Sequence, residues 1–297
     1  MTHGLSDRSD QDQRATQAAS GSIFTRYGKT NFKRVTLLVF LAAGTLPVTA
    51  YASDAAELAK KTQNPISDLL SVPFQLNYDR GIGAKDDGSK TVLNIQPVIP
   101  ISLGADWNLI SRTIIPLVDQ NDILPNGAAD ASGIGDVVQS LFFSPKRPTS
   151  SGWILGAGPV LLLRTASDDL LGSEKWGLGP TAVALKQENG WTYGALTNHI
   201  WSVAGNDERD DISATFIQPF LSYTTKKLTS FTVNTESTYD WKGEQWSVPV
   251  NLMVSQVLKV GDQPLSIQAG VRYWADRPDN GPEGWGFRLA VTFLFPK

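Results

Sequence analysis

Apolar and polar residues alternate with a period of two along the last part of the chain. In the C-terminal segment "GWGFRLAVTFLFPK" one face carries the apolar side chains Trp285, Phe287, Leu289, Val291, Phe293 and Phe295. Segments 231–241, 246–255 and 265–274 repeat this alternation. Successive side chains of a β-strand point to opposite faces, so the pattern predicts four consecutive strands, each with an apolar and a largely polar face.

The pattern continues upstream with more noise. Segments between residues 74 and 225 also favour strands, which gives about twelve in all, most of about ten or more residues. Strands of this length can cross a bilayer when tilted. The predicted connections alternate between long polar ones, such as "IGAKDDGSK" and "GNDERDD", and short ones, such as "ENG" and "GDQ". Two connections fit this alternation poorly, "SPKRPTSS" and "KGE".

Two fold classes have such strands, a soluble β-sandwich and a membrane β-barrel. Aromatic residues at the ends of the apolar stripes are typical of membrane interfaces, as at Trp241, Trp246, Tyr273 and Trp285. The opposite face is small and polar, which suits a wet lumen better than a packed core. We therefore predict an all-β fold: an antiparallel transmembrane β-barrel of about twelve strands, preceded by a short helical or irregular segment.

The N-terminus predicts export. Basic residues between Arg26 and Arg34 precede the apolar run "VTLLVFLAAGTLPVTA", and "AYA" at residues 50–52 supplies a small-residue processing site. This order is typical of a secretory signal peptide, and an uncleaved anchor is the alternative. The predicted organisation is a signal peptide with a polar leader at 1–52, a periplasmic or lumen-plugging segment at 53–72, and the barrel at 73–297.

The amino-acid composition argues against several classes of function. The net charge of −3 and the lack of a Lys/Arg cluster argue against nucleic acid as a partner. Without cysteine there is no disulfide, thiolate metal site or Cys nucleophile. Acidic loops such as "GNDERDD" match no calcium-binding spacing. We therefore predict no cofactor and no metal site.

Several strings are similar to a bacterial outer-membrane family called "MetA-pathway of phenol degradation", a group of outer-membrane transporters whose members often carry the label neuromedin U. Among them are "LNIQPVIP", "DWNLISRTIIPL", "LLGSEKWGLGPTAVALKQ", "NHIWSVAG", "EQWSVPVNLMVS" and "GPEGWGFRLAVTFLFPK". The resemblance covers about Thr62 to Lys297. It implies a Gram-negative outer-membrane barrel that transports small, hydrophobic or aromatic compounds, and it supplies no catalytic residues.

Strand periodicity points six charged side chains inward, because a charge facing lipid near the midplane costs a few kcal/mol. These lumen-lining candidates are Asp79, Arg112, Glu236, Asp240, Arg272 and Arg288. One interpretation is a charged constriction that selects solutes by sign and size. The other is a structural ion-pair network that fills a narrow barrel.

His199 in "NHIWS" raises an enzymatic alternative, since a Ser–His pair could hydrolyse lipids. Ser202, three residues on, falls on the opposite strand face, so a serine from an adjacent strand would be required. We predict that the protein is not an enzyme and that His199 is an interfacial or lumen-lining residue.

Seven prolines fall inside the predicted strands and are expected at bulges or bends, because proline removes a ladder donor. They are Pro97, Pro100, Pro116, Pro159, Pro180, Pro219 and Pro249.

The combined prediction is a porin-like channel in the bacterial outer membrane with both termini in the periplasm. The expected partners are outer-membrane lipids and lipopolysaccharide, the barrel-assembly machinery and a small-molecule solute. The alternatives are an outer-membrane lipid-modifying enzyme and a non-conducting structural or adhesion barrel.

Overall fold

The computed structural model describes residues 52–123 and 130–296. The predicted signal peptide lies outside these residues except for Ala52. One helix, α2 (Ala52–Thr62), precedes the strands, and among the described residues no helix is long and apolar enough to cross a membrane. The first strand, β1, begins at Leu70.

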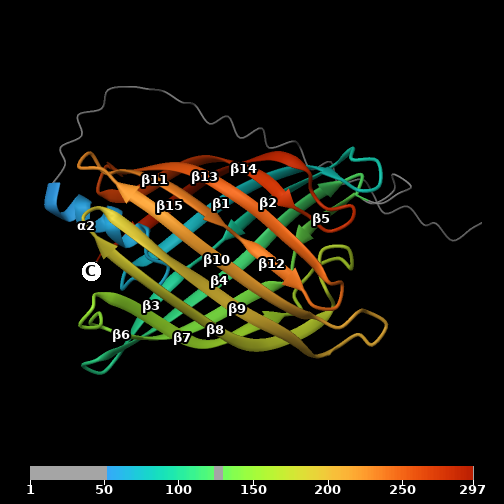
Figure 1. Cartoon of the computed structure of the whole chain (residues 1–297), viewed down its shortest axis with the longest axis horizontal. Helices are drawn as coiled ribbons and strands as arrows, with labels where there is room; N and C mark the ends of the chain where they lie inside the picture. The colour runs from blue at the N-terminus through green and yellow to red at the C-terminus, as the bar shows by residue number, and fades with distance from the viewer. Residues whose placement is uncertain (1–51, 124–129, 297) are drawn as a thin grey trace, which may run out of the picture. The chain divides into compact units, whose positions relative to one another are not determined.

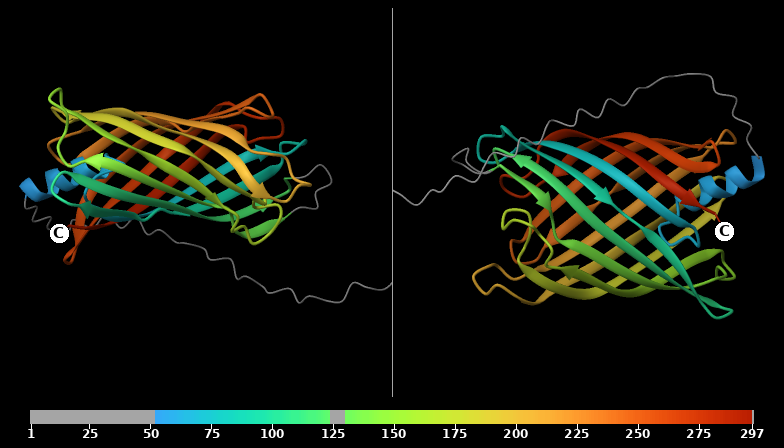
Figure 2. Two further views of the ribbon diagram at one scale, coloured as in Figure 1. Left: turned by 90° about the horizontal axis from the view of Figure 1, so that it is seen from below. Right: turned by 180° about the vertical axis from the view of Figure 1, so that it is seen from behind.

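The strands form one antiparallel barrel (Figures 1 and 2). In chain order they are β1 (Leu70–Ile82), β2 (Gly88–Ile95), β3 (Val98–Leu103), β4 (Trp107–Asn121), β5 (Ala131–Ile134), β6 (Val137–Pro145), β7 (Trp153–Leu163), β8 (Lys175–Glu188), β9 (Trp191–Gly205), β10 (Ser213–Thr224), β11 (Thr229–Thr235), β12 (Ser237–Asp240), β13 (Gln245–Val260), β14 (Gln263–Asp276) and β15 (Gly284–Phe295). Three pairs, β2/β3, β5/β6 and β11/β12, are single wall strands with a short break, so the wall has 12 strands, and the prediction of this fold is confirmed.

The first and last strands close the barrel. Their register runs from Leu70 opposite Phe295 to Tyr78 opposite Phe287. Closure leaves no open sheet edge, as a bilayer requires. The C-terminal apolar stripe is the outer face of this closing strand: Trp285, Phe287, Leu289, Phe293 and Phe295 are all exposed, whereas Arg288 is buried.

The two ends of the barrel differ in their connections. We call the end where β1 begins and β15 ends the terminal end, and the opposite end the loop end. The turns at the terminal end include 104–106, 189–190 and 261–262, while the loop end carries 83–87, 164–174, 206–212 and 277–283. In Figure 1, α2 lies at the terminal end, beside the C-terminus.

Prolines interrupt the ladders at several of the expected positions. Pro97 separates β2 from β3, and Pro249 adjoins a register shift between β13 and β14. Pro159 and Pro180 are opposite each other on β7 and β8, and the outer ladders beside them, β6–β7 and β8–β9, each skip two residue pairs. Each proline lacks the N–H that a ladder bond would use. Pro100, Pro116 and Pro219 lie within regular pairing.

Candidate functional site

An ion-pair network lies on the inner wall of the barrel. The Arg288 guanidinium donates through Nη1 and Nη2 to the two carboxylate oxygens of Glu236, at 2.8 and 2.6 Å. Its Nε donates to Asn77 Oδ1 at 2.7 Å, and the whole side chain is 2% exposed. A two-pronged contact of this kind fixes both partners and compensates both charges. Because β13 and β14 separate the strands of this pair, the contact ties together distant parts of the wall.

A second cation extends the network. Arg272 on β14 contacts Asp79 of β1, with 3.3 Å between Nη1 and Oδ2, and its Nη2 is 3.8 Å from Glu236. The indole of Trp274 donates to the other Asp79 oxygen at 2.8 Å and lies under the Arg272 guanidinium, 4.8 Å from it. We call the group Asp79, Glu236, Arg272 and Arg288 the charged network. It contains two cations and two anions.

The structure brings four of the six predicted lumen candidates into this network, and the other two make no direct contact with its side chains within the described part of the chain. Arg112 on β4 donates to Gln96 at 2.9 Å and, among the described residues, forms no ion pair. Asp240 is exposed at the end of β12, where its carboxylate accepts from the Lys242 backbone in the following turn. The polar partners Asn77 and Gln96 were not predicted, although Asn77 alternates with the outward residues of β1 and Gln96, in the break between β2 and β3, continues the inward positions of Asn94 and Val98.

Residues 59–69, the last residues of α2 and the segment that leads to β1, pack inside the terminal end of the barrel. Ile66 joins a buried cluster with inward-facing residues of the wall: Val98, Ile110, Phe142, Val183, Leu185 and Leu196. Ala59 and Leu69 form a second cluster with Val257 and Leu294. Two hydrogen bonds add to this packing, from Thr232 to Gln63 at 3.2 Å and from Gln187 to the Lys60 carbonyl at 2.9 Å. The chain thus obstructs part of this mouth.

A cavity of about 520 Å³ lies between residues 61–69 and the charged network. Along β1 its lining residues Ser71, Pro73 and Gln75 precede Asn77, the partner of Arg288, and the network residue Asp79. Glu236 and Arg288 contribute to the lining on the network side. On β1 the cavity therefore lies nearer the terminal end than the charged network does.

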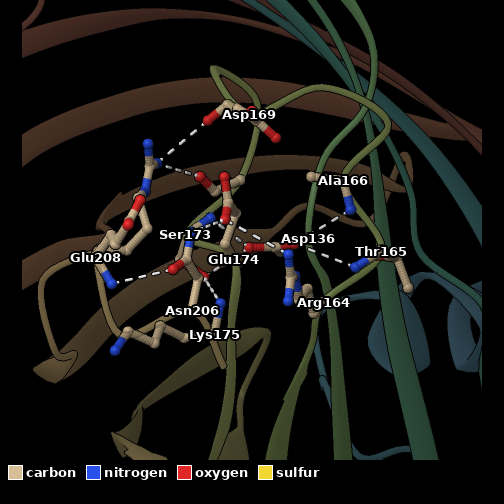
Figure 3. A network of polar contacts seen from close by, with 12 residues as sticks. Asp136, Arg164, Thr165, Ala166, Asp169, Ser173, Glu174, Lys175, Asn206 and Glu208 are labelled. Atoms are coloured by element: carbon tan, nitrogen blue, oxygen red, sulfur yellow. Dashed lines mark hydrogen bonds and ion pairs between the residues drawn. The ribbon is translucent and has the colours of Figure 1, made fainter. Parts of the chain in front are cut away.

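A second polar network orders the loop end (Figure 3). The carboxylate of Asp136, in the break between β5 and β6, accepts from the backbone of Thr165 and Ala166 at 3.2 Å each. It also accepts from both the backbone and the hydroxyl of Ser173, at 2.7 Å each. One carboxylate therefore holds both ends of loop 164–174. The middle of this loop contacts the wall, because Gln120 donates to the Leu170 carbonyl at 3.1 Å.

The same network connects loop 164–174 to loop 206–212. Glu174 accepts from Asn206 at 2.6 Å, and this hydrogen bond lowers the pKa of the Glu174 carboxyl. Lys175 contacts Asp211 at 3.0 Å, and this contact, with a hydrogen bond from Ser202, lowers the pKa of Asp211. These contacts favour the ionised carboxylates and so join the two loops at neutral pH.

His199 points to the outer face of the barrel, among aromatic residues. Its ring packs on Trp201 with 4.1 Å between centroids, and Nδ1 is 2.7 Å from Thr215 Oγ1. The serine that a hydrolytic pair would need is present on β10, where Ser213 Oγ is 3.5 Å from His199 Nε2. The Trp241 indole also donates to Thr215, at 2.8 Å. The side chains of His199, Thr215 and Trp241 are therefore hydrogen-bonded to one another, and Trp201 packs on the histidine ring.

No protein-family model and no curated protein sequence matches the chain. Solved structures do match. The COG4313 outer membrane channel from Pseudomonas putida F1 is 17% identical with a TM-score of 0.59, covering 76% of this chain and 94% of that one. The NanC porin is 9% identical with a TM-score of 0.47 and coverage of 77% and 100%. Outer membrane phospholipase A from Escherichia coli is 10% identical with a TM-score of 0.43 and coverage of 76% and 92%. The similarity to the Pseudomonas putida protein supports the barrel fold.

Proposed function

We propose that the protein is an outer-membrane channel for small solutes, with both termini in the periplasm. The observation that carries the proposal is a cavity lined by charged, polar and apolar side chains inside a closed barrel whose outer face is apolar. A structural or adhesion barrel has no need of such a cavity. The resemblance noted above favours small apolar or aromatic compounds as solutes, and lipids, lipopolysaccharide and the assembly machinery are the proposed partners.

Single-channel recording tests this proposal. The full chain, folded in detergent and inserted into planar lipid bilayers, is expected to give discrete but small openings, because residues 59–69 obstruct one mouth. A folded barrel that inserts and shows no openings at any voltage contradicts the channel and favours the structural or adhesion alternative. Folding is checked separately by the shift in electrophoretic mobility on heating.

We propose further that the His199 cluster stabilises the membrane interface and is not a hydrolytic centre. The Ser213–His199 distance of 3.5 Å exceeds the usual reach of a general base, about 2.6–3.2 Å. Trp241 also donates to the hydroxyl that would orient the histidine. A serine-directed fluorophosphonate should leave the folded protein unlabelled. Labelling that disappears in Ser213→Ala and in His199→Ala would instead support a lipid-modifying enzyme.

A further inference from the structure

Three cations line the cavity between residues 61–69 and the charged network, and two of them are in direct contact with carboxylates. Lys61 contacts Glu57 at 2.8 Å and Asp68 at 3.1 Å. Arg288 makes its two-pronged contact with Glu236. Among the described residues, the Arg112 guanidinium has only the neutral Gln96 amide oxygen as its hydrogen-bond partner and forms no ion pair with a carboxylate.

A guanidinium inside a barrel with no carboxylate in direct contact is costly, because transfer of a charge out of water is unfavourable unless an anion accompanies it. Gln96 is itself buried and holds one side of the guanidinium through Nη2. The remaining donors of a guanidinium form a planar fork that matches a carboxylate. Arg112 is therefore suited to bind one carboxylate from a solute.

The other lining residues indicate which uncharged groups such a solute has besides its carboxylate. Apolar side chains line the wall at Ile114, Val138, Ile200, Phe216 and Phe220, with carboxamides at Gln75, Asn94, Gln218 and Asn234. A volume of about 520 Å³ falls in the range of small-molecule sites, in which apolar walls surround a few polar groups. Glu236 at the network side would repel a second negative charge on the same molecule.

We propose that this cavity is a binding site for a small organic monocarboxylate with an apolar body, and that Arg112 is the residue that binds its carboxylate. The inference rests on the proposed channel function and names the class of solute that the lumen would pass. Gln96 acts as a positioning residue, because it holds the guanidinium.

Binding of 4-fluorobenzoate to the full chain folded in detergent tests the proposal without requiring conductance, since ¹⁹F NMR reports binding directly. We expect saturable binding that Arg112→Gln weakens by about tenfold or more. Arg112→Lys, which keeps the charge but loses the fork, should bind with intermediate affinity. If Arg112→Gln fails to fold, this lysine variant supplies the comparison.

Lys90→Gln is the matched control, because Lys90 is an inward cation opposite Asp79 in the β1–β2 register and does not line the cavity. It should leave binding unchanged. Two ligands separate charge from apolar body: 4-fluorobenzyl alcohol and acetate should each compete poorly with 4-fluorobenzoate. The proposal is wrong if 4-fluorobenzoate does not bind, if Arg112→Gln and Lys90→Gln bind it like the parent, or if the alcohol competes equally well.

Conductance measured on the same preparations separates this proposal from the proposed function. A barrel that conducts without binding the carboxylate overturns the inference alone. A barrel that binds it at Arg112 without conducting overturns the channel and leaves the binding site in place.

Discussion

Glu236 is the central residue of the charged network, since it contacts both Arg288 and Arg272. Removing it leaves two buried guanidinium groups with only Asp79 as a carboxylate nearby. Breaking a buried pair by deleting one partner costs about 3–5 kcal/mol. We expect Glu236→Ala to lower the free energy of unfolding in urea by about this amount.

The same substitution raises the net positive charge of the lumen, so reversal potentials in a salt gradient should shift toward anion selectivity. Asp279→Ala is the control, because Asp279 is an exposed acid in loop 277–283. It should change neither property. Equal effects of the two variants on stability would show that the network contributes little to it.

The Lys175–Asp211 contact at the loop end should depend on pH. The pKa of Asp211 is lowered from an ordinary value of 3.8, mainly by the hydrogen bond from Lys175. A lowered pKa in the folded state means that the contact is fully present above the unfolded value and is lost as the pH falls through the folded one. The link between Lys175 and loop 206–212 should therefore be constant from pH 5 to 8 and should loosen only below about pH 4.

A spin label can report this change, because the chain has no cysteine and Asp207→Cys supplies a single attachment site in loop 206–212. Label mobility should rise only in the acid range. With Asp211→Asn added, mobility should already be high at neutral pH. A rise centred near pH 6 in the protein that retains Asp211 would point to a different titrating group.

Strand parity alone predicted that the charged residues of the network face inward, because a period of two leaves only two faces. It did not predict their pairing. Which inward residues meet depends on the stagger between strands, and Arg288 reaches Glu236 across two intervening strands. Asp240 has the predicted parity but lies where β12 ends, and strand ends are poorly marked in the sequence.

At the scale of elements, residues 59–69 form the least covalently constrained part of the lumen, because only one end of this segment continues into the wall. Its main apolar contact is Ile66, which is 4% exposed. Ile66→Asp places a charge among the apolar side chains of Val98, Phe142 and Leu196, which is unfavourable. We expect the segment to leave the lumen and single-channel conductance to increase.

Glu57→Gln is the control, since Glu57 is exposed on α2 and, within the described residues, its carboxylate forms an ion pair only with Lys61. Its conductance should equal that of the parent. If Ile66→Asp folds and conducts as the parent does, residues 59–69 do not limit the flow of ions.

The sequence predicted about twelve wall strands and expected a bulge or bend at Pro97, but it did not predict the other breaks. The break at Pro97 has a visible cause, because proline lacks the ladder donor. The break between β5 and β6 arises from tertiary contacts: Gly135 bonds to Pro116, and Asp136 turns to hold loop 164–174. Neither residue signals this in the local hydrophobic pattern, because the partners of Asp136 lie about thirty residues further along the chain.

The outer and inner faces of the barrel wall differ in polarity and exposure. On β13 the outward residues Leu252 and Val254 are 52% and 42% exposed, while Asn251 between β11 and β14 is fully buried. The outer face must therefore be covered by something apolar. A bilayer supplies this cover, and both ends of the barrel carry exposed tryptophans, such as Trp191 at the terminal end and Trp285 at the loop end.

A bilayer around the barrel should make the cost of an outward-facing arginine depend on its depth along a strand. Leu252 is at the middle of β13 and Val260 at its terminal end, and both side chains are exposed on the outer face. Leu252→Arg should lower the free energy of unfolding from lipid vesicles by about 2–4 kcal/mol, and Val260→Arg by about 0–1 kcal/mol. Reversible urea titration in vesicles measures both. Equal, small costs at the two positions would mean that lipid does not cover the middle of β13, and the transmembrane placement of the barrel would then be wrong.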